Sequence, residues 1–232
     1  MIGLSIIIPC LNEEGNIRKC IERIPKMPYS AEVIVVDDGS KDKTSQTARN
    51  TKNPNLKKIK VVSYKNNRGK GYAFRKGLEH AEGQVVIILD ADMTSPPEEI
   101  PLITGPIFAG KADFVNGSRL FYPMEKGAMK WLHIPGNRIF ALIISLIIGK
   151  YLTDTLCGFK AFKRQLIPVQ ELKENSWMDF ELLIKAKRNN LRIAEVPIHY
   201  KARKAGLSKM RTFKHGYNMF MMLLKAIQKN EA

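Results

Sequence analysis

One stretch of the sequence, residues 84–94 (QVVIILDADMT), constrains the fold more than any other. Its apolar run Val85–Leu89 is rich in β-branched residues and too short for a helix, which predicts a strand buried on both faces. Two carboxylates, Asp90 and Asp92, follow the strand and are separated only by Ala91. Both can turn toward one point beyond the carboxyl edge of a sheet, where open α/β sheets bind ligands.

Two carboxylates at such a point suit a hard divalent cation. Mg²⁺ or Mn²⁺ would complete its shell with water and the oxygens of a diphosphate. Two acids after a strand are also common as a turn and helix cap, so this pattern alone leaves both interpretations open.

A first strand is predicted over Leu4–Ile8, ending at Pro9. Asn12 and Glu13 come next. Asn12 can cap a helix that runs to about Arg23, with the glutamate near its positive end, or both residues can bind a ligand.

A second buried strand, Glu32–Val36, ends in Asp37 and Asp38, followed by a glycine and a serine. A carboxylate at this position can accept hydrogen bonds from the base or ribose of a nucleotide. We expect a helix over 42–50 and a third strand over 57–63.

The loop 66–71 (NNRGKG) then combines two glycines with the cations Arg68 and Lys70. Glycines let a backbone approach a ligand closely, and the cations suit an anion. The alternative is a basic turn without a ligand.

Composition limits the partners and the compartment. The 232 residues are 44% hydrophobic, enough for the core of one domain, and 38 Lys and Arg against 22 Asp and Glu give a formal charge of +16. That charge implies nucleic acid, phosphorylated substrates or an anionic bilayer as partners. The three cysteines lack metal-ligand spacing and are expected to be reduced, and no secretory signal is expected, which points to the cytosol or the cytosolic face of a membrane.

The second half of the sequence is expected to hold the acceptor. A short strand over 113–116 leads to Arg119, whose guanidinium is well shaped to neutralise a phosphate. The apolar run 139–148 is far shorter than the roughly 20 residues of a membrane-spanning helix. It is therefore a buried helix or a helix in the membrane interface, and the flanking cations favour the interface: Lys126, Lys130, Arg138 and Lys150. Arg138 is a second candidate for the acceptor phosphate.

A helix over 177–188 carries Asp179 at its beginning, and a last strand over 192–200 contains Pro197, which suggests a sheet edge. The loop 201–211 that follows holds five cations. It is either a solvated basic loop or a lid in which Arg203 and Lys209 clamp phosphates, with Ser208 at the acceptor phosphate.

Four blocks of the sequence, LSIIIPCLNEE, VIVVDDGSKDKT, NRGKGYAFRKGL and VVIILDADMTSPPE, resemble the nucleotide-sugar-binding half of glycosyltransferase family 2. Within it they are most similar to the polyprenyl-phosphate (dolichol-phosphate) mannose and glucose synthases. The likeness continues through VNGSRL, DTLCGFKAF, MDFELLIKA and EVPIHYKARKAGLSK, to about Arg211.

The resemblance implies an α/β GT-A (Rossmann-like) fold with a mixed, mostly parallel sheet flanked by helices. It also implies interface helices near 127–150 and 212–229, with residues 1–211 as the catalytic domain and 212–232 as a C-terminal amphipathic helix.

The resemblance also implies roles for single residues. The nucleotide sugar would be bound by Pro9, Leu11, Asn12, Glu13, Asp38, Arg68, Lys70, Asp90, Ala91, Asp92 and Asp154. The metal would be held by Asp90 and Asp92, with Thr94 where the mannose synthases usually have a glutamine. The implied catalytic group is Asp92, Arg119, Asp179, Arg203 and Lys209.

The implied reaction is an inverting transfer of a hexose from a nucleotide sugar (GDP-mannose or a UDP-sugar) to polyprenyl phosphate at the cytosolic membrane face. A lipid phosphate needs no general base, so Asp179 would then bind the sugar or orient the metal site. A relative that glycosylates a sugar hydroxyl would use Asp179 as its base, and a plain helix-dipole role is a third interpretation. A nucleic-acid-binding protein is the remote alternative, but no nucleic-acid motif is present.

Overall fold

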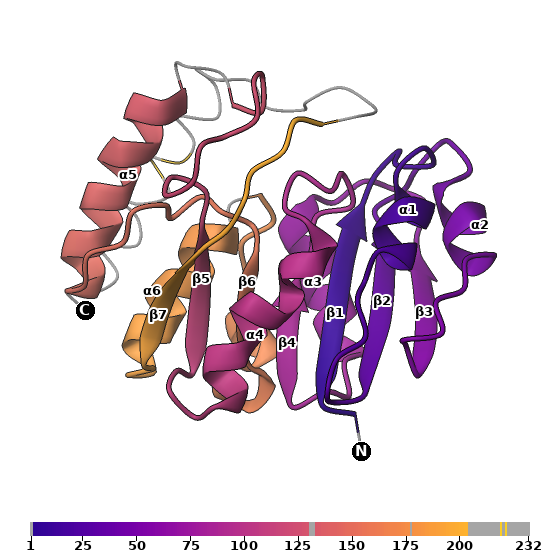
Figure 1. Cartoon of the computed structure of the whole chain (residues 1–232), viewed down its shortest axis with the longest axis horizontal. Helices are drawn as coiled ribbons and strands as arrows, with labels where there is room; N and C mark the ends of the chain where they lie inside the picture. Colours follow the sequence, from indigo (N-terminus) through magenta and orange to yellow (C-terminus); the bar gives the residue numbers. More distant parts are fainter. Residues whose placement is uncertain (1, 130–132, 177, 204–218, 220, 222–232) are drawn as a thin grey trace.

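The computed structural model describes residues 2–129, 133–176, 178–203, 219 and 221. In that part of the chain, seven strands form one sheet in the order β3-β2-β1-β4-β6-β5-β7 (Figure 1). The strands are β1 (Leu4–Cys10), β2 (Ala31–Asp37), β3 (Lys58–Ser63), β4 (Val85–Ile88), β5 (Phe114–Ser118), β6 (Lys160–Lys163) and β7 (Ile193–Pro197).

The sheet is mixed and mostly parallel. β1 pairs in parallel with β2 and β4, β2 with β3, and β5 with β7. Only β6 runs antiparallel, between β4 and β5. The predicted fold class is confirmed, and β7 lies at the sheet edge as its proline indicated.

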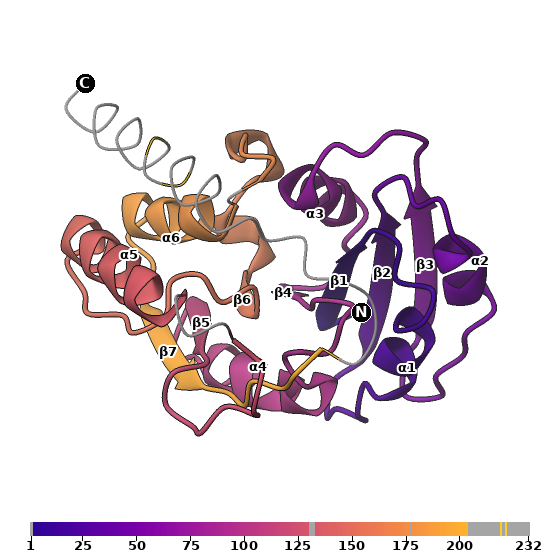
Figure 2. The same cartoon turned by 90° about the horizontal axis from the view of Figure 1, so that it is seen from above.

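Helices cover both faces of the sheet (Figure 2). One face packs against α1 (Ile17–Glu22), α2 (Thr44–Arg49) and α4 (Ile100–Phe108). The other face packs against α3 (Lys70–Glu79), α5 (His133–Ile148) and α6 (Met178–Arg188). Because alternate strand residues point to opposite faces, Ile6 of β1 lies in the first core and Ile7 in the second. Short 3₁₀ turns occur at Pro97–Glu99, Arg164–Leu166 and Val169–Glu171.

Two boundaries near the N-terminus differ from the prediction. β1 continues through Pro9, although a proline cannot donate to a ladder. The reason is that β4 pairs with β1 only as far as Ile7, so the missing N–H at Pro9 costs no bond on that side.

The predicted start of the first helix at Asn12 was also wrong. Asn12 adopts a left-handed backbone with φ 52°, and α1 begins only at Ile17. The Asn12 N–H donates to Ser40 Oγ (2.8 Å), and its side-chain oxygen accepts from the Lys41 N–H (2.8 Å). Asn12 therefore joins the loops after β1 and β2 instead of capping a helix.

α5 is apolar on two sides. Its buried side includes Ala141, Ile144 and Ile148, whereas Ile139, Leu142 and Leu146 are 57–74% exposed. Among the described helices, none is long and apolar enough to cross a membrane. The predicted helix near 212–229 lies outside the described residues except for Met219 and Met221. Cys10, Cys20 and Cys157 are buried and free, as expected.

Candidate functional site

The strand order reverses between β1 and β4, because β1 leads outward to β2 and β3 on one side and β4 lies on the other. Such a reversal leaves the loops at the carboxyl ends of the strands diverging, which is where α/β sheets bind ligands. The loop after β1 carries Glu13, the loop after β2 carries Asp38, and the loop after β4 carries Asp90 and Asp92. The predicted acids therefore lie at one edge of the sheet.

Asp90 is held by Lys70 at the start of α3. Lys70 Nζ lies 2.6 Å from Asp90 Oδ1, and both side chains are 31% exposed. Burial disfavours the charged ammonium, but Asp90 and Asp179 outweigh it and raise the pKa of Lys70 above its ordinary value. Gly158 packs directly against this pair, since a Cβ there would lie 2.7 Å from both Asp90 Oδ2 and Lys70 Nζ.

Asp92 is held by two other side chains. Its Oδ1 accepts from the Thr94 N–H (3.1 Å) and hydroxyl (2.9 Å), and its Oδ2 accepts from Arg203 (3.1 Å). Arg203 also donates to Glu13, so one guanidinium joins the loops after β1 and β4. Burial and the neighbouring Asp90 raise the pKa of Asp92. Thr94, a predicted metal contact, thus orients a predicted metal ligand.

The segment that carries Arg203 follows β7 and crosses the site edge of the sheet (Figure 1). Its backbone is fixed at several points. The Lys201 N–H donates to the Thr94 carbonyl (2.8 Å), the Ala202 N–H to Glu125 Oε2 (2.9 Å), and the His199 N–H to Glu99 Oε2 (3.0 Å). These contacts hold Arg203 next to Asp92 and Glu13.

Asp38 fixes the basic loop before α3. Its two carboxylate oxygens accept from the Arg68 and Gly69 N–H groups at 2.7 and 2.9 Å. The guanidinium of Arg68 lies over the Tyr72 ring, 4.9 Å from its centroid. A nucleotide contact by Asp38 would therefore compete with its backbone hydrogen bonds.

The glycines of this loop allow a close approach of another part of the protein, whereas their approach to a ligand stays a prediction. A Cβ at Gly69 would lie 2.6 Å from the Asn175 carbonyl oxygen, and one at Gly71 would lie 2.1 Å from that of Glu174. Arg75 donates to the same Glu174 carbonyl (2.6 Å). The loop 173–175 is thus packed tightly against the start of α3.

That loop leads into α6, where Asp179 lies in the first turn. Asp179 is 9% exposed, and among the described residues its Oδ1 has no hydrogen-bond partner. Burial raises the pKa of Asp179, although the positive charges of Lys70 and Lys160 oppose the shift.

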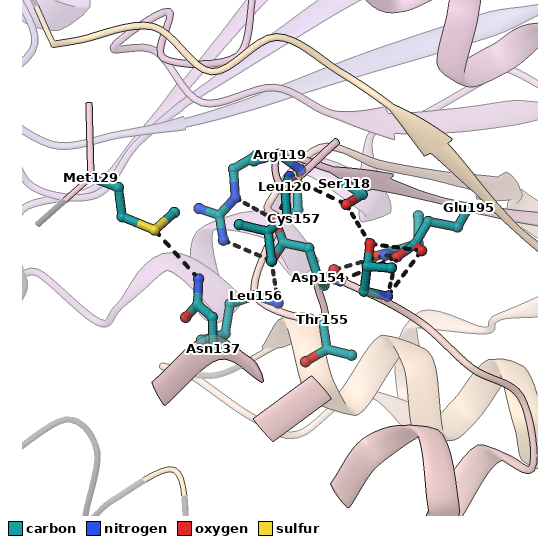
Figure 3. A network of polar contacts seen from close by, with 12 residues as sticks. Ser118, Arg119, Leu120, Met129, Asn137, Asp154, Thr155, Leu156, Cys157 and Glu195 are labelled. Atoms are coloured by element: carbon teal, nitrogen blue, oxygen red, sulfur yellow. Dashed lines mark hydrogen bonds and ion pairs between the residues drawn. The ribbon is translucent and has the colours of Figure 1, made fainter. Parts of the chain in front are cut away.

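Arg119 and Asp154 form a buried, bidentate ion pair (Figure 3). Arg119 Nε lies 2.6 Å from Asp154 Oδ2, and its Nη2 lies 2.8 Å from Oδ1. Burial opposes ionisation of Asp154, but the guanidinium outweighs it and lowers the pKa of this carboxyl. The Arg119 guanidinium also lies over the Tyr200 ring (5.0 Å to its centroid). A phosphate-binding role for Arg119 stays a prediction, and it would share the guanidinium with Asp154.

Some of the other predicted site residues lie away from Asp90 and Asp92, and two lie outside the described residues. Arg138 is exposed on α5, next to Asn137, whose amide nitrogen lies 3.8 Å from Met129 Sδ (Figure 3). Pro9 and Ala91 are buried backbone neighbours of the site, and Leu11 is half-buried. Ser208 and Lys209 lie outside the described residues.

The sequence analysis predicted no role for three residues of this region, Gly158, Lys160 and Glu195. Gly158 and Lys160 belong to the block GFKAF, where a lysine between two aromatic residues could have indicated burial. Glu195 of β7 accepts from the Thr153 N–H (2.9 Å) and the Asn116 amide (3.0 Å), and thereby holds the segment that leads into Asp154. No local pattern marks this glutamate.

Comparison with known proteins gives a consistent result. A family model described as glycosyl transferase family 2 matches residues 5–168. The dolichyl-phosphate hexose transferase of Haloferax volcanii is 33% identical, over 92% of this chain and 89% of its own length. The UDP-N-acetylglucosamine–dolichyl-phosphate N-acetylglucosaminyltransferase of Methanococcus voltae is 30% identical, over 95% of this chain and 94% of its own length. A longer curated relative is matched over 53% of its length.

Among solved structures, glucosyl-3-phosphoglycerate synthase from Mycobacterium tuberculosis, in complex with Mn²⁺ and UDP-glucose, superimposes with a TM-score of 0.72 at 23% identity. The match covers 97% of this chain and 78% of that one, and it shows a shared GT-A fold. The chain therefore belongs to glycosyltransferase family 2, and within that family of enzymes it is close to the dolichyl-phosphate sugar transferases.

Proposed function

We propose that the chain transfers a hexose from a nucleotide diphosphate sugar to polyprenyl (dolichyl) phosphate, with inversion at the anomeric carbon. The observation that carries this proposal is the convergence of Asp90 and Asp92 with Lys70 and Arg203 at the switch point of the sheet. Acids for a cation and cations for a diphosphate are both needed by a donor of this kind. The choice of dolichyl phosphate as acceptor is supported by the two relatives above, both of which are named as dolichyl-phosphate transferases.

The acids at the switch point fit a divalent cation. Burial and the neighbouring Asp90 raise the pKa of Asp92, so the two carboxylates lie close enough to repel each other, and a bound cation would relieve that repulsion. The described residues contain no group of three or more His, Cys, Asp or Glu suited to a metal. Asp90 and Asp92 would therefore supply two ligands, and diphosphate oxygens and water the rest, as Mg²⁺ and Mn²⁺ sites commonly require. When bound, the cation supplies charge that stabilises the leaving nucleoside diphosphate.

Side chains of the protein would bind the nucleoside, the diphosphate and the sugar. Asp38 and Arg68 would contact the nucleoside, and Lys70 and Arg203 would leave their carboxylate partners to contact the diphosphate. Asp179, buried across from Lys70, would accept hydrogen bonds from the sugar hydroxyls. An acceptor phosphate already carries a nucleophilic oxygen at neutral pH, so it attacks the anomeric carbon without a base. Catalysis would then consist mostly of positioning and charge stabilisation.

The acceptor would be reached at the cytosolic face of a membrane, with α5 in the interface. The exposed side chains Ile139, Leu142, Leu146 and Tyr151 offer apolar contact to a bilayer, and the last of these is 76% exposed. The cationic Arg138 lies exposed among them, which suits anionic headgroups.

One observation favours a second function, transfer to a sugar hydroxyl. Asp179 has a raised pKa and a buried, unpartnered oxygen among the described residues, as a general base requires. The two functions differ in whether polyprenyl phosphate is consumed.

The test is incubation with UDP- and GDP-sugars, a short polyprenyl phosphate and Mn²⁺, followed by counting sugar in the organic extract. We expect labelled lipid from at least one donor and none from Asp90→Ala/Asp92→Ala. The matched control is Glu79→Ala/Glu82→Ala, which removes two exposed carboxylates outside the site. Unchanged transfer by the Asp90→Ala/Asp92→Ala variant would refute the proposal. Transfer from the same donors to an added sugar acceptor, without labelled lipid, would favour the second function.

A further inference from the structure

Arg203 binds two acids that come from different loops of the candidate site. Its Nη1 lies 3.1 Å from Asp92 Oδ2, and its Nη2 contacts Glu13 Oε1. Asp92 is a candidate ligand of the cation, whereas Glu13 lies in the loop after β1. A guanidinium can hold two acids at once because its N–H donors form a planar fork. One arginine therefore links a candidate metal ligand to a second acid.

Glu13 is the more firmly fixed of these two acids. Its side chain is 7% exposed, against 19% for Asp92. Glu13 Oε2 accepts from the Asn16 amide (2.7 Å), and the Glu13 N–H donates to Thr44 Oγ1 (2.8 Å). Its carbonyl accepts from the Asn16 and Ile17 N–H groups at the start of α1 (2.9 Å each). Glu13 is thus bound to the first turns of α1 and α2 and cannot shift without breaking these contacts.

The backbone that carries Arg203 is held independently of its two ion pairs. Three backbone N–H groups of the segment 199–202 donate to Thr94, Glu99 and Glu125. The side chain of Arg203 can therefore exchange one partner for another while its backbone stays in place.

The other candidate metal ligand, Asp90, is also bonded to a cation of the chain, since Lys70 Nζ lies 2.6 Å from Asp90 Oδ1. Lys70 and Arg203 would compete with a divalent cation for these carboxylates, because like charges repel at such short distances. A diphosphate offers both displaced side chains new anionic partners. Binding of the diphosphate and binding of the divalent cation would therefore favour each other, and linked binding of this kind is reciprocal.

We propose that Arg203 pivots on Glu13 between two partners. Its Nη1 binds Asp92 before the donor arrives, and it moves to the diphosphate when a divalent cation is bound at Asp92. Glu13 is then a positioning residue that holds Arg203 in both arrangements. As a result the chain binds a divalent cation weakly by itself and tightly together with a diphosphate. The inference rests on the proposed function, which places the acids and the diphosphate at one site but does not by itself couple their binding.

The first test measures the affinity for Mn²⁺ alone and for Mn²⁺ at saturating UDP or GDP, from the loss of the free Mn²⁺ signal in electron paramagnetic resonance. After correction for the Mn²⁺–nucleotide complex in solution, we expect the unmodified chain to bind Mn²⁺ at least tenfold more tightly with the nucleotide. Arg203→Gln should bind Mn²⁺ alone at least threefold more tightly, because Asp92 loses a competing partner. It should bind the nucleotide at saturating Mn²⁺ at least tenfold more weakly. A purely structural role for Arg203 would not shift the two affinities in opposite directions.

The second test concerns Glu13. Glu13→Gln removes the charge and keeps an oxygen acceptor for the Asn16 amide. We expect the nucleotide at saturating Mn²⁺ to bind at least fivefold more weakly to this variant. The double variant Glu13→Gln/Arg203→Gln should be no weaker than Arg203→Gln alone. Such non-additivity is the signature of one residue acting through another, whereas a direct contact of Glu13 with the nucleotide would give additive losses.

Lys201→Gln is the matched control. It removes one positive charge from the same segment and keeps the backbone N–H that donates to the Thr94 carbonyl. Both affinities are expected to change less than twofold. If Arg203→Gln does not fold, as judged by circular dichroism, Arg203→Met replaces it, because it keeps an apolar stem without the charge.

Three results would overturn the inference while the proposed function stands. The first is equal affinity of the unmodified chain for Mn²⁺ with and without the nucleotide. The second is a gain in Mn²⁺ affinity for Lys201→Gln as large as that for Arg203→Gln, and the third is additive losses in the double variant. Failure of the unmodified chain to bind either UDP or GDP with Mn²⁺ would instead refute the proposed donor.

Discussion

Gly71→Ala tests the close contact between the start of α3 and the loop 173–175. The added Cβ would lie 2.1 Å from the Glu174 carbonyl oxygen, so the loop must retreat by more than about 1 Å to reach an ordinary van der Waals separation. That retreat breaks two hydrogen bonds: Gly71 N–H to the Asn175 carbonyl (2.7 Å) and Arg75 to the Glu174 carbonyl (2.6 Å).

The cost follows from these two bonds. A neutral hydrogen bond contributes about 1 kcal/mol and one from a charged donor about 1.5–3 kcal/mol. Replacing a helical glycine by alanine returns up to about 1 kcal/mol. We therefore expect the free energy of unfolding to fall by about 1.5–3 kcal/mol.

Urea unfolding measures this loss as a lower midpoint with an unchanged m-value. The control is Gly136→Ala in α5, where no atom of the described residues lies within 4 Å of the added Cβ and where a gain of about 0.5–1 kcal/mol is expected. If Gly71→Ala were as stable as the unmodified chain while the control gained stability, the contact between α3 and the loop would not be as tight as described.

Three further predictions concern the site and the surface. The nearest atoms to the Cβ of Gly158→Ala are side-chain atoms of Asp90 and Lys70, which can shift without moving the backbone, so we expect less than about 1 kcal/mol of lost stability but at least about tenfold slower transfer; normal transfer would contradict this. Asp154→Asn leaves Arg119 buried without its counter-ion and should cost about 3–5 kcal/mol at pH 7. Because the folded pKa of Asp154 lies below its unfolded value of about 3.9, the stabilisation is complete above that pH and is lost below it, so the difference between the two proteins should narrow as pH falls below about 4. A difference in urea midpoints that stayed constant from pH 7 to pH 3 would contradict the assignment. Leu146→Glu, at a side chain 74% exposed, should weaken sedimentation with anionic vesicles by about tenfold or more without changing circular dichroism; unchanged sedimentation would exclude this face as the membrane contact.

The centre of the sheet could be predicted from sequence because β1, β2 and β4 are short runs rich in β-branched residues and buried on both faces. β6 was missed because its four residues, KAFK, carry a lysine at each end and resemble a surface segment. The helix boundary at Asn12 was wrong because a contact with the loop after β2, 28 residues away, outweighs the local capping preference.

The candidate site was predictable where it follows from strand ends and not where it depends on tertiary contacts. Asp90 and Asp92 lie together because one strand delivers both. The ion pair of Arg203 with Glu13 joins residues 190 positions apart. A role for that arginine was predicted from the family resemblance and not from the local sequence. Lys160 was not considered, because its burial depends on the reversed strand that places it.

The insertion of β6 has a consequence for how the chain acquires its shape during synthesis. β4 can join β1 once about the first 90 residues are available, but its other side stays an open edge until Lys160–Lys163 arrives, and β5 waits for the same four residues before it is connected to the rest. An open strand edge invites pairing with other chains, and long-range pairings form slowly. The nascent protein is thus most prone to misassociation in the interval between β4 and β6, and a chaperone would contribute most during that interval.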